Sequence, residues 1–122
     1  MKKFIQILVA SVVLSVGNSA IADPKLQEMV GVWKWADFTI RVNKCTETEV
    51  CAKVVTGPKN IGLEMIQSKL KSSDGSFLGK IAHPQTGKTY NSKISMLSKD
   101  VWHVDGCTDA NVCASGDFKR IK

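Results

Sequence analysis

Turn-forming residues recur at short intervals along this chain and leave only short segments for regular structure. Two of these segments, 38–43 and 90–96, alternate apolar and polar residues with a period of two. Such alternation is typical of strands with one buried face. The pattern predicts one short helix at Pro24–Val30 and eight strands, at residues 31–36, 38–45, 50–56, 63–70, 77–83, 89–97, 101–106 and 113–121.

Eight consecutive antiparallel strands form an up-and-down meander, which has two unpaired edges unless the first strand pairs with the last. We therefore expect an all-β barrel, whose interior at this strand number holds side chains or one small ligand. Gly31 and Trp33 open the first strand, and Arg120 lies in the last. This pattern resembles the G-x-W start and late arginine of lipocalin and calycin barrels. The resemblance implies that the Arg120 guanidinium packs over Trp33 and closes the barrel floor.

The first 22 residues predict export. Two lysines precede an apolar run over residues 4–16, and Ala20-Ile21-Ala22 is typical of a cleavage site. The run is shorter than the roughly 20 apolar residues that a transmembrane helix needs. We expect a signal peptide over residues 1–22 and a single soluble domain over residues 23–122, located in the periplasm or secreted.

The segments CTETEVC and CTDANVC place four cysteines in two C-x5-C pairs. An exported chain favours disulfides over thiolates, and each pair can bridge the two arms of a hairpin. The preferred pairs are therefore Cys45–Cys51 and Cys107–Cys113. The alternatives are a zinc site made of all four thiolates, which mostly uses shorter spacings, and a redox-active pair, which usually reads C-x-x-C.

The charge pattern indicates a solvated surface. The formal net charge is +6, and it falls to +4 for residues 23–122 because the signal carries Lys2, Lys3 and no acid. The lysines are scattered along the chain and do not form one basic face with interleaved aromatics. We therefore expect no nucleic-acid binding, and only weak attraction to anionic surfaces or acidic partners.

A closer resemblance extends over about the whole of residues 23–122. Its elements are the G-x-W start, the C…C hairpin followed by Lys53-Val54-Val55, then residues 74–81, residues 84–90 and a late Gly106-Cys107. This order resembles the bacterial exported domain family 2147 of unknown function. The resemblance implies a small, secreted, barrel-like protein with no established activity. The chain differs from the family pattern at Ala52, where glycine is usual, and at Phe118, where tryptophan is usual.

Residues 82–89 formally match the phosphate-binding pattern [AG]-x4-G-K-[ST]. That motif must join a strand to a helix, whereas the residues that follow alternate as a strand does. We interpret the segment as a hairpin turn. The two histidines, His83 and His103, lack a recognisable nucleophile motif and the spacing of a metal site. We therefore expect no catalytic residues, no metal and no cofactor, with an enzyme that uses His83 or His103 as the alternative.

The remaining prediction is a non-catalytic binding module, expected to be a monomer. It would hold a small apolar ligand inside the barrel, or a protein or glycan partner on the barrel rim. The candidate lining is aromatic, because such rings supply large apolar surfaces. The residues proposed for it are Trp33, Trp35, Phe38 and Tyr90.

Overall fold

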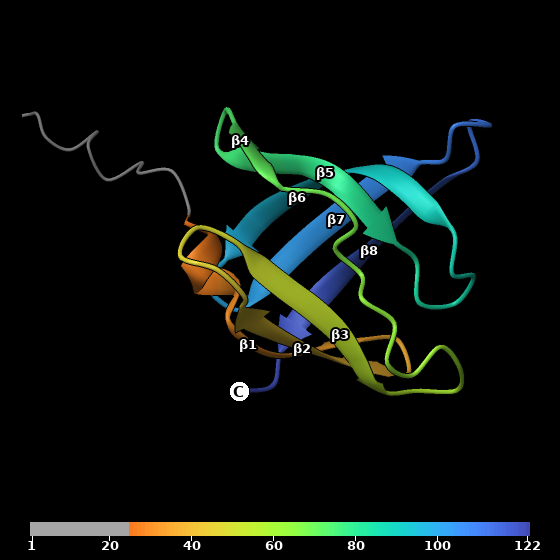
Figure 1. Cartoon of the computed structure of the whole chain (residues 1–122), viewed down its shortest axis with the longest axis horizontal. Helices are drawn as coiled ribbons and strands as arrows, with labels where there is room; N and C mark the ends of the chain where they lie inside the picture. Colours follow the sequence, from red (N-terminus) through yellow and green to blue (C-terminus); the bar gives the residue numbers. More distant parts are fainter. Residues whose placement is uncertain (1–24) are drawn as a thin grey trace, which may run out of the picture.

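The computed structural model describes residues 25–122 and consists almost entirely of antiparallel strands (Figure 1). The signal peptide predicted over residues 1–22 lies outside the described residues. One 3-10 turn, η3, spans Leu26–Met29. The strands are β1 (Gly31–Trp35), β2 (Phe38–Lys44), β3 (Val50–Thr56), β4 (Lys71–Ser73), β5 (Ser76–Ala82), β6 (Thr89–Ser98), β7 (Val101–Cys107) and β8 (Cys113–Arg120).

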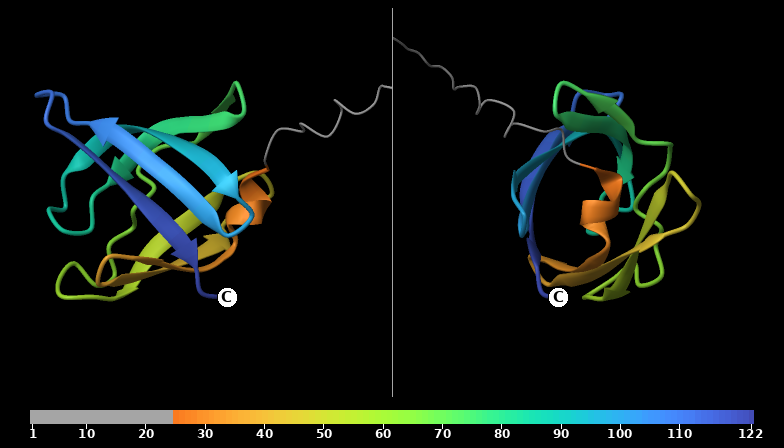
Figure 2. Two further views of the ribbon diagram at one scale, coloured as in Figure 1. Left: turned by 180° about the vertical axis from the view of Figure 1, so that it is seen from behind. Right: turned by 90° about the vertical axis from the view of Figure 1, so that its left-hand side faces the viewer.

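All eight strands belong to one sheet in the order β3-β2-β1-β8-β7-β6-β5-β4. The first strand pairs with the last, since Trp33 lies opposite Arg120 and Lys34 opposite Lys119. Every pairing is antiparallel. The sheet curls into a half-barrel around one core (Figure 2). The predicted all-β class and the pairing of the chain ends are therefore confirmed.

The region predicted as the fourth strand has a different structure. Residues 63–70 form two isolated bridges, Lys53 with Glu64 and Ile66 with Ile81, and the fourth strand is the short β4 instead. Met65 explains the difference, because its N–H donates to Ala52 O on β3 at 2.7 Å while its carbonyl accepts from Ala82 on β5 at 2.7 Å. Residues 61–68, here called the seam, therefore join the β3 and β5 sides of the half-barrel.

The predicted helix is reduced to the single turn η3, and Pro24 lies outside the described residues. Leu26 and Met29 pack against the core, and the Trp33 indole N–H donates to Met29 O at 2.8 Å. The turn thus covers one end of the barrel (Figure 2). Within residues 25–122, no helix has the length and apolar character needed to cross a membrane.

The core follows from the alternation of the strands. Inward-facing residues of β1, β2, β3, β5, β6 and β7 meet in one cluster. The largest side chains with almost no exposure are Trp33, Trp102, Phe38, Ile40, Ile94 and Val54. Removing such a side chain from water contributes about 1.5–3 kcal/mol of stability. The barrel interior is therefore occupied mainly by its own side chains.

Arg120 closes the floor of the barrel. Its guanidinium carbon lies 4.3 Å from the centroid of the Trp33 ring. The same group donates to Glu28 O at 2.7 Å and Val30 O at 3.0 Å, and pairs with Asp100 at 3.0 Å. Gly31 has a φ of +149°, and a Cβ there would lie 2.5 Å from the guanidinium. Glycine is thus required for the arginine to approach.

Candidate functional site

The end of the barrel opposite this floor carries four rings, here called the mouth: Trp35, His83, Tyr90 and Phe118. The Trp35 indole stacks on Phe118 at a centroid distance of 5.9 Å and on Phe38 at the same distance. His83 meets Trp35 edge-on at 4.9 Å and lies 5.4 Å from Tyr90. Such stacked and edge-on geometries are the arrangements that aromatic rings favour.

A cavity of about 40 Å³ lies between these rings and the small residues of β7 and β8. Ala114, Gly106 and Gly116 are part of its wall. A Cβ at Gly116 would lie 1.9 Å from the Trp35 Nε1 atom. Gly116 is therefore the reason that the Trp35 ring can lie against β8 and cover the cavity.

His83 stands on the loop that joins β5 to β6. The backbone N–H of His83 donates to Lys88 O at 2.8 Å. The backbone N–H of Gly87, a residue with a φ of +73°, donates to His83 O at 2.7 Å. Segment 82–89 is therefore the predicted hairpin turn. The Gln85 N–H donates to His83 Nδ1 at 3.1 Å, which places the ring proton on Nε2. Burial lowers the pKa of His83 below its ordinary value of 6.5, because the charged ring is desolvated.

A second cavity of about 40 Å³ lies deeper, between the mouth and the floor. Its wall includes Trp33 and Trp102, whose rings meet edge-on at a centroid distance of 6.3 Å. The two cavities share four side chains: Met65, Ile81, Val104 and Phe118. Typical small-molecule pockets enclose about 300–1,000 Å³. The interior therefore consists of two small voids separated by side chains.

The structure distributes the four candidate ligand-binding residues over different places. Trp35 and Tyr90 line the mouth cavity, and Trp33 lines the deeper one. Phe38 lines neither, because it is fully buried behind Trp35. Sequence reasoning did not select Gly116 for the site. Glycine inside a predicted strand signals close approach of another group, which could have drawn attention to this position.

His103 lies on the outer face of β7, away from the mouth cavity lining. Its Nδ1 atom is 2.7 Å from Asp117 Oδ1 on β8, and its Nε2 atom is 3.6 Å from Asp105 Oδ2. His83, by contrast, forms no ion pair with a carboxylate of residues 25–122. The two histidines therefore belong to different surroundings. No cluster of three or more potential metal ligands occurs in this part of the chain.

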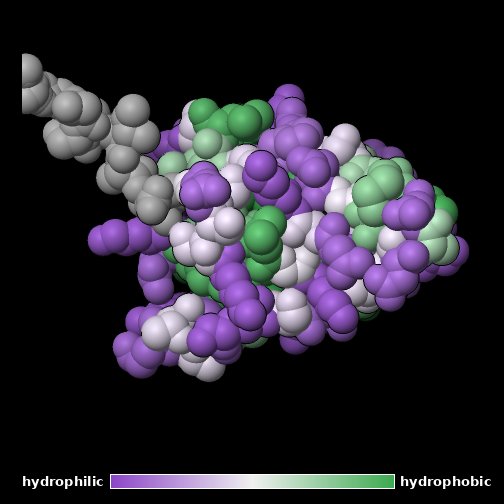
Figure 3. All heavy atoms as spheres, turned by 90° about the horizontal axis from the view of Figure 1, so that it is seen from above, coloured by the Kyte–Doolittle hydropathy of each residue, from purple (hydrophilic) through white to green (hydrophobic). Residues whose placement is uncertain are grey.

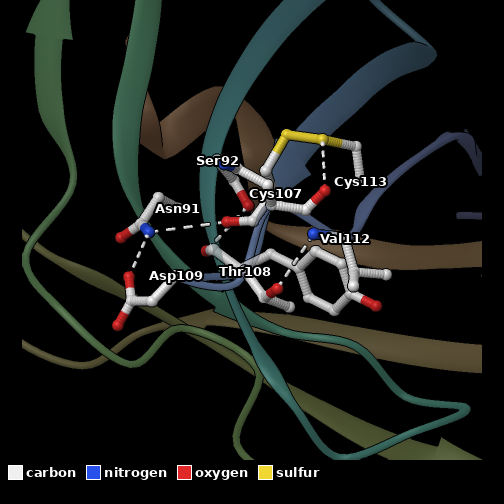
Figure 4. The surroundings of a disulfide bond; sticks show 9 residues. Asn91, Ser92, Cys107, Thr108, Asp109, Val112 and Cys113 are labelled. Carbon is white, nitrogen blue, oxygen red and sulfur yellow. Dashed lines mark hydrogen bonds between the residues drawn. A yellow bond between two sulfur atoms is a disulfide. The ribbon is translucent and has the colours of Figure 1, made fainter.

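The four cysteines form the two predicted disulfides, Cys45–Cys51 and Cys107–Cys113. Figure 4 shows the second loop, in which the Val112 N–H donates to the Thr108 hydroxyl oxygen at 3.1 Å. Asn91 of β6 donates to Asp109 at 2.9 Å and ties the loop to the sheet. In the first loop, the Thr46 hydroxyl oxygen accepts from Thr48 N at 3.3 Å. In both loops the threonine hydroxyl oxygen therefore accepts from a backbone N–H of its own loop, two residues further on at Thr46 and four residues further on at Thr108.

The fold and its bridges define a small, disulfide-bonded β half-barrel domain. Within that class, the chain belongs to the family described as uncharacterised proteins conserved in bacteria, DUF2147, whose model matches residues 31–120. The resemblance noted from the sequence is thus confirmed over nearly all of the described residues. Neither a search of curated proteins nor a search of solved structures finds a match.

Proposed function

We propose that this protein is a non-catalytic binding module that takes a small apolar group of a larger partner into its mouth. One observation supports this proposal: four rings border a void of about 40 Å³ whose opposite wall includes Gly106, Ala114 and Gly116. A single water needs about 10–15 Å³ by the same measure. The void therefore suits a group of a few heavy atoms, while the rest of the partner, protein or glycan, would stay on the rim.

The mouth favours an apolar group over a charged one. Burial lowers the pKa of His83 and so favours its neutral form, which has no positive charge to offer to an anion. A neutral imidazole and three aromatic rings present mainly apolar surface. A long lipid would have to displace the Met65 and Phe118 side chains that separate the two cavities.

A cavity-filling variant tests the proposal. Ala114→Leu would fill the mouth void, whereas Ala110→Leu adds the same side chain in the exposed disulfide loop. Xenon is a suitable small apolar probe, and its binding is followed by amide chemical shifts at Trp35 and Tyr90. We expect saturable shifts in the native protein and in Ala110→Leu, and none in Ala114→Leu.

Two outcomes would contradict this proposal. One is the absence of saturable shifts at the mouth of the native protein. The other is a long-chain lipid that co-purifies with the protein in native mass spectrometry, since such a ligand needs a hollow barrel. The second outcome would leave a binding function in place but move it from the rim to the interior.

We also propose that the protein acts outside the cytoplasm, in the periplasm or after secretion. The signal peptide predicted over residues 1–22 supports this location, and two disulfides are typical of oxidising compartments. N-terminal sequencing of protein from the periplasmic fraction checks the proposal. The expected first residue is Asp23, and an intact Met1 would contradict signal cleavage.

A further inference from the structure

A lysine-rich depression lies on the outer face of β4, β5 and β6. Its volume of about 570 Å³ exceeds that of either interior cavity. Figure 3 views the side of the molecule on which β4 and β5 lie, where hydrophilic side chains stand between separate hydrophobic areas. We call this depression the lysine groove; among its lining residues are Lys69, Lys71, Lys80, Lys93, Leu78 and Asp105.

The sheet register sets the pattern of the groove. Leu78 on β5 lies opposite Lys71 on β4 and opposite Lys93 on β6. Neighbouring strands are about 4.8 Å apart, so two lysine side chains flank one apolar side chain. Leu78 is 43% exposed, which leaves its end available for contact. Lys80, two residues further along β5, extends the positive charge on the same face.

The groove holds most of the excess positive charge of the chain. Its four lysines against Asp105 give a net charge of +3, compared with +4 for residues 23–122 after Lys2 and Lys3 are removed. None of the four lysines forms an ion pair with a carboxylate of the described residues. Like charges gathered in one depression repel each other, and an acidic partner would relieve that repulsion.

The side chains of the groove distinguish among acidic partners. Its cations are lysines, which pair with single carboxylates as point charges and impose no fixed orientation of the kind that the planar fork of arginine imposes. The lining has no aromatic ring on which a sugar could stack, whereas Leu78 offers an apolar contact between two charges.

We propose that the lysine groove binds an extended acidic peptide segment of a partner protein, with an apolar side chain on Leu78 and carboxylates on Lys71 and Lys93. This site is separate from the mouth, since among the lining residues only Ser92 and Gly106 border both depressions. The two proposals can therefore fail independently. The binding is expected to weaken steeply with salt, because its charges are exposed.

A fluorescent synthetic peptide with a central leucine between glutamates tests this proposal by anisotropy on the disulfide-bonded protein. The double variant Lys71→Glu/Lys93→Glu should weaken binding at least about tenfold, equivalent to about 1.4 kcal/mol. Lys34→Glu/Lys119→Glu is the matched control, because these lysines are also exposed and lie opposite each other, on β1 and β8. The control should change the affinity less than about threefold.

The contribution of Leu78 is tested separately. Leu78→Ser in the protein, and serine in place of the central leucine in the peptide, should each weaken binding without removing its salt dependence. Equal losses in the two lysine double variants would show nonspecific charge attraction and overturn the proposal. Tighter binding of a polyuronate than of the peptide, or no binding of the peptide at low salt, would overturn it as well.

Discussion

Arg120 is a single residue on which the barrel floor depends. Its guanidinium covers Trp33, pairs with Asp100 and donates to backbone carbonyls of the segment around η3. Arg120→Ala would remove these interactions and leave the carbonyls with fewer partners. We expect a loss of about 2–4 kcal/mol in the free energy of unfolding.

Urea unfolding followed by tryptophan fluorescence measures this loss. Arg120→Lys keeps the positive charge but lacks the fork that reaches several oxygens, so an intermediate loss is expected. Arg41→Ala is the control, since Arg41 is exposed on β2 and should change stability by less than about 0.5 kcal/mol. Equal losses in the free energy of unfolding of Arg120→Ala and Arg41→Ala would contradict the role of Arg120 in closing the barrel floor.

His83, in the mouth, is expected to make the stability of the protein depend on pH. Its folded-state pKa is lowered by desolvation, so near pH 6.5 the unfolded chain takes up a proton more readily than the folded chain. The contribution of His83 to stability is therefore fully present above pH 6.5 and is lost as the pH falls below that value. His83→Gln should lose this part of the pH dependence.

The measurement is the free energy of unfolding between about pH 8 and about pH 5, the range in which histidine titrates. Wild type should lose more stability on acidification than His83→Gln does. His103→Gln serves for comparison, because His103 contacts Asp105 and Asp117 and has a different environment. Parallel pH curves for wild type and His83→Gln would contradict the assignment.

At the scale of elements, each disulfide bridges one strand pair. Cys107 and Cys113 are directly opposite each other on β7 and β8, and Cys51 lies on β3, opposite Asn43 of β2. Each bond closes a loop with a sequence separation of 6. The loop-entropy model gives about 2 kcal/mol for a loop this short, so each bond stabilises a hairpin and does not define the topology.

Replacing both cysteines of one pair with alanine should therefore lower the free energy of unfolding by about 2 kcal/mol and leave the strand content unchanged. Far-UV circular dichroism checks the strands, and urea unfolding measures the stability. The two double variants serve as controls for each other, because both loops have the same length. Loss of the folded spectrum on removal of either bond would show that the bridges determine the fold.

At the scale of the whole molecule, the seam decides whether the half-barrel is held together. The Glu64 carboxylate accepts from Ala52 N at 2.7 Å and from Ile66 N at 3.1 Å, in place of a continuous strand ladder. Hydrogen bonds to a charged group contribute about 1.5–3 kcal/mol each. Glu64→Ala should therefore destabilise the protein by at least about 2 kcal/mol and loosen the contact between β3 and the seam.

Hydrogen exchange at the amides of Ala52 and Ile66 reports on this contact. Both amides should exchange faster in Glu64→Ala, whereas Glu64→Gln retains one acceptor oxygen and should show a smaller effect. Glu47→Ala is the matched control, because the Glu47 side chain is 92% exposed in the first disulfide loop. Unchanged exchange rates of the Ala52 and Ile66 amides in Glu64→Ala would show that the Glu64 carboxylate does not hold the seam to β3.

Most strands could be predicted from the sequence because alternation and turn residues act locally. Every strand except β4 agrees with its predicted range within one residue at each end, and both disulfides agree with the predicted pairs. The seam was mistaken for a strand, because Leu63 and Met65 continue the apolar pattern. In the folded protein the backbone of Met65 bonds to Ala52 of β3 and to Ala82 of β5, partners that the local pattern does not specify.

The candidate sites could also be predicted only in part from the sequence. The aromatic residues of the mouth were recognisable by type, but only the fold brings Trp35, His83 and Phe118 together and places Phe38 behind them. The lysines appear scattered along the chain because their spacing is irregular. Strand pairing brings Lys71, Lys80 and Lys93 to one outer face, and Lys69 precedes β4 beside them, since register, and not sequence distance, decides which side chains are neighbours.

The sequence by itself determined the all-β class, the hairpin bridges, the family and the pairing of the chain ends, because each depends on local pattern or on residues at fixed spacings. The tertiary structure alone decided that the interior is divided into two small voids, that the seam joins the half-barrel, and that positive charge gathers outside β4–β6. These features depend on side-chain volumes and on strand register, which act only once distant segments are packed together.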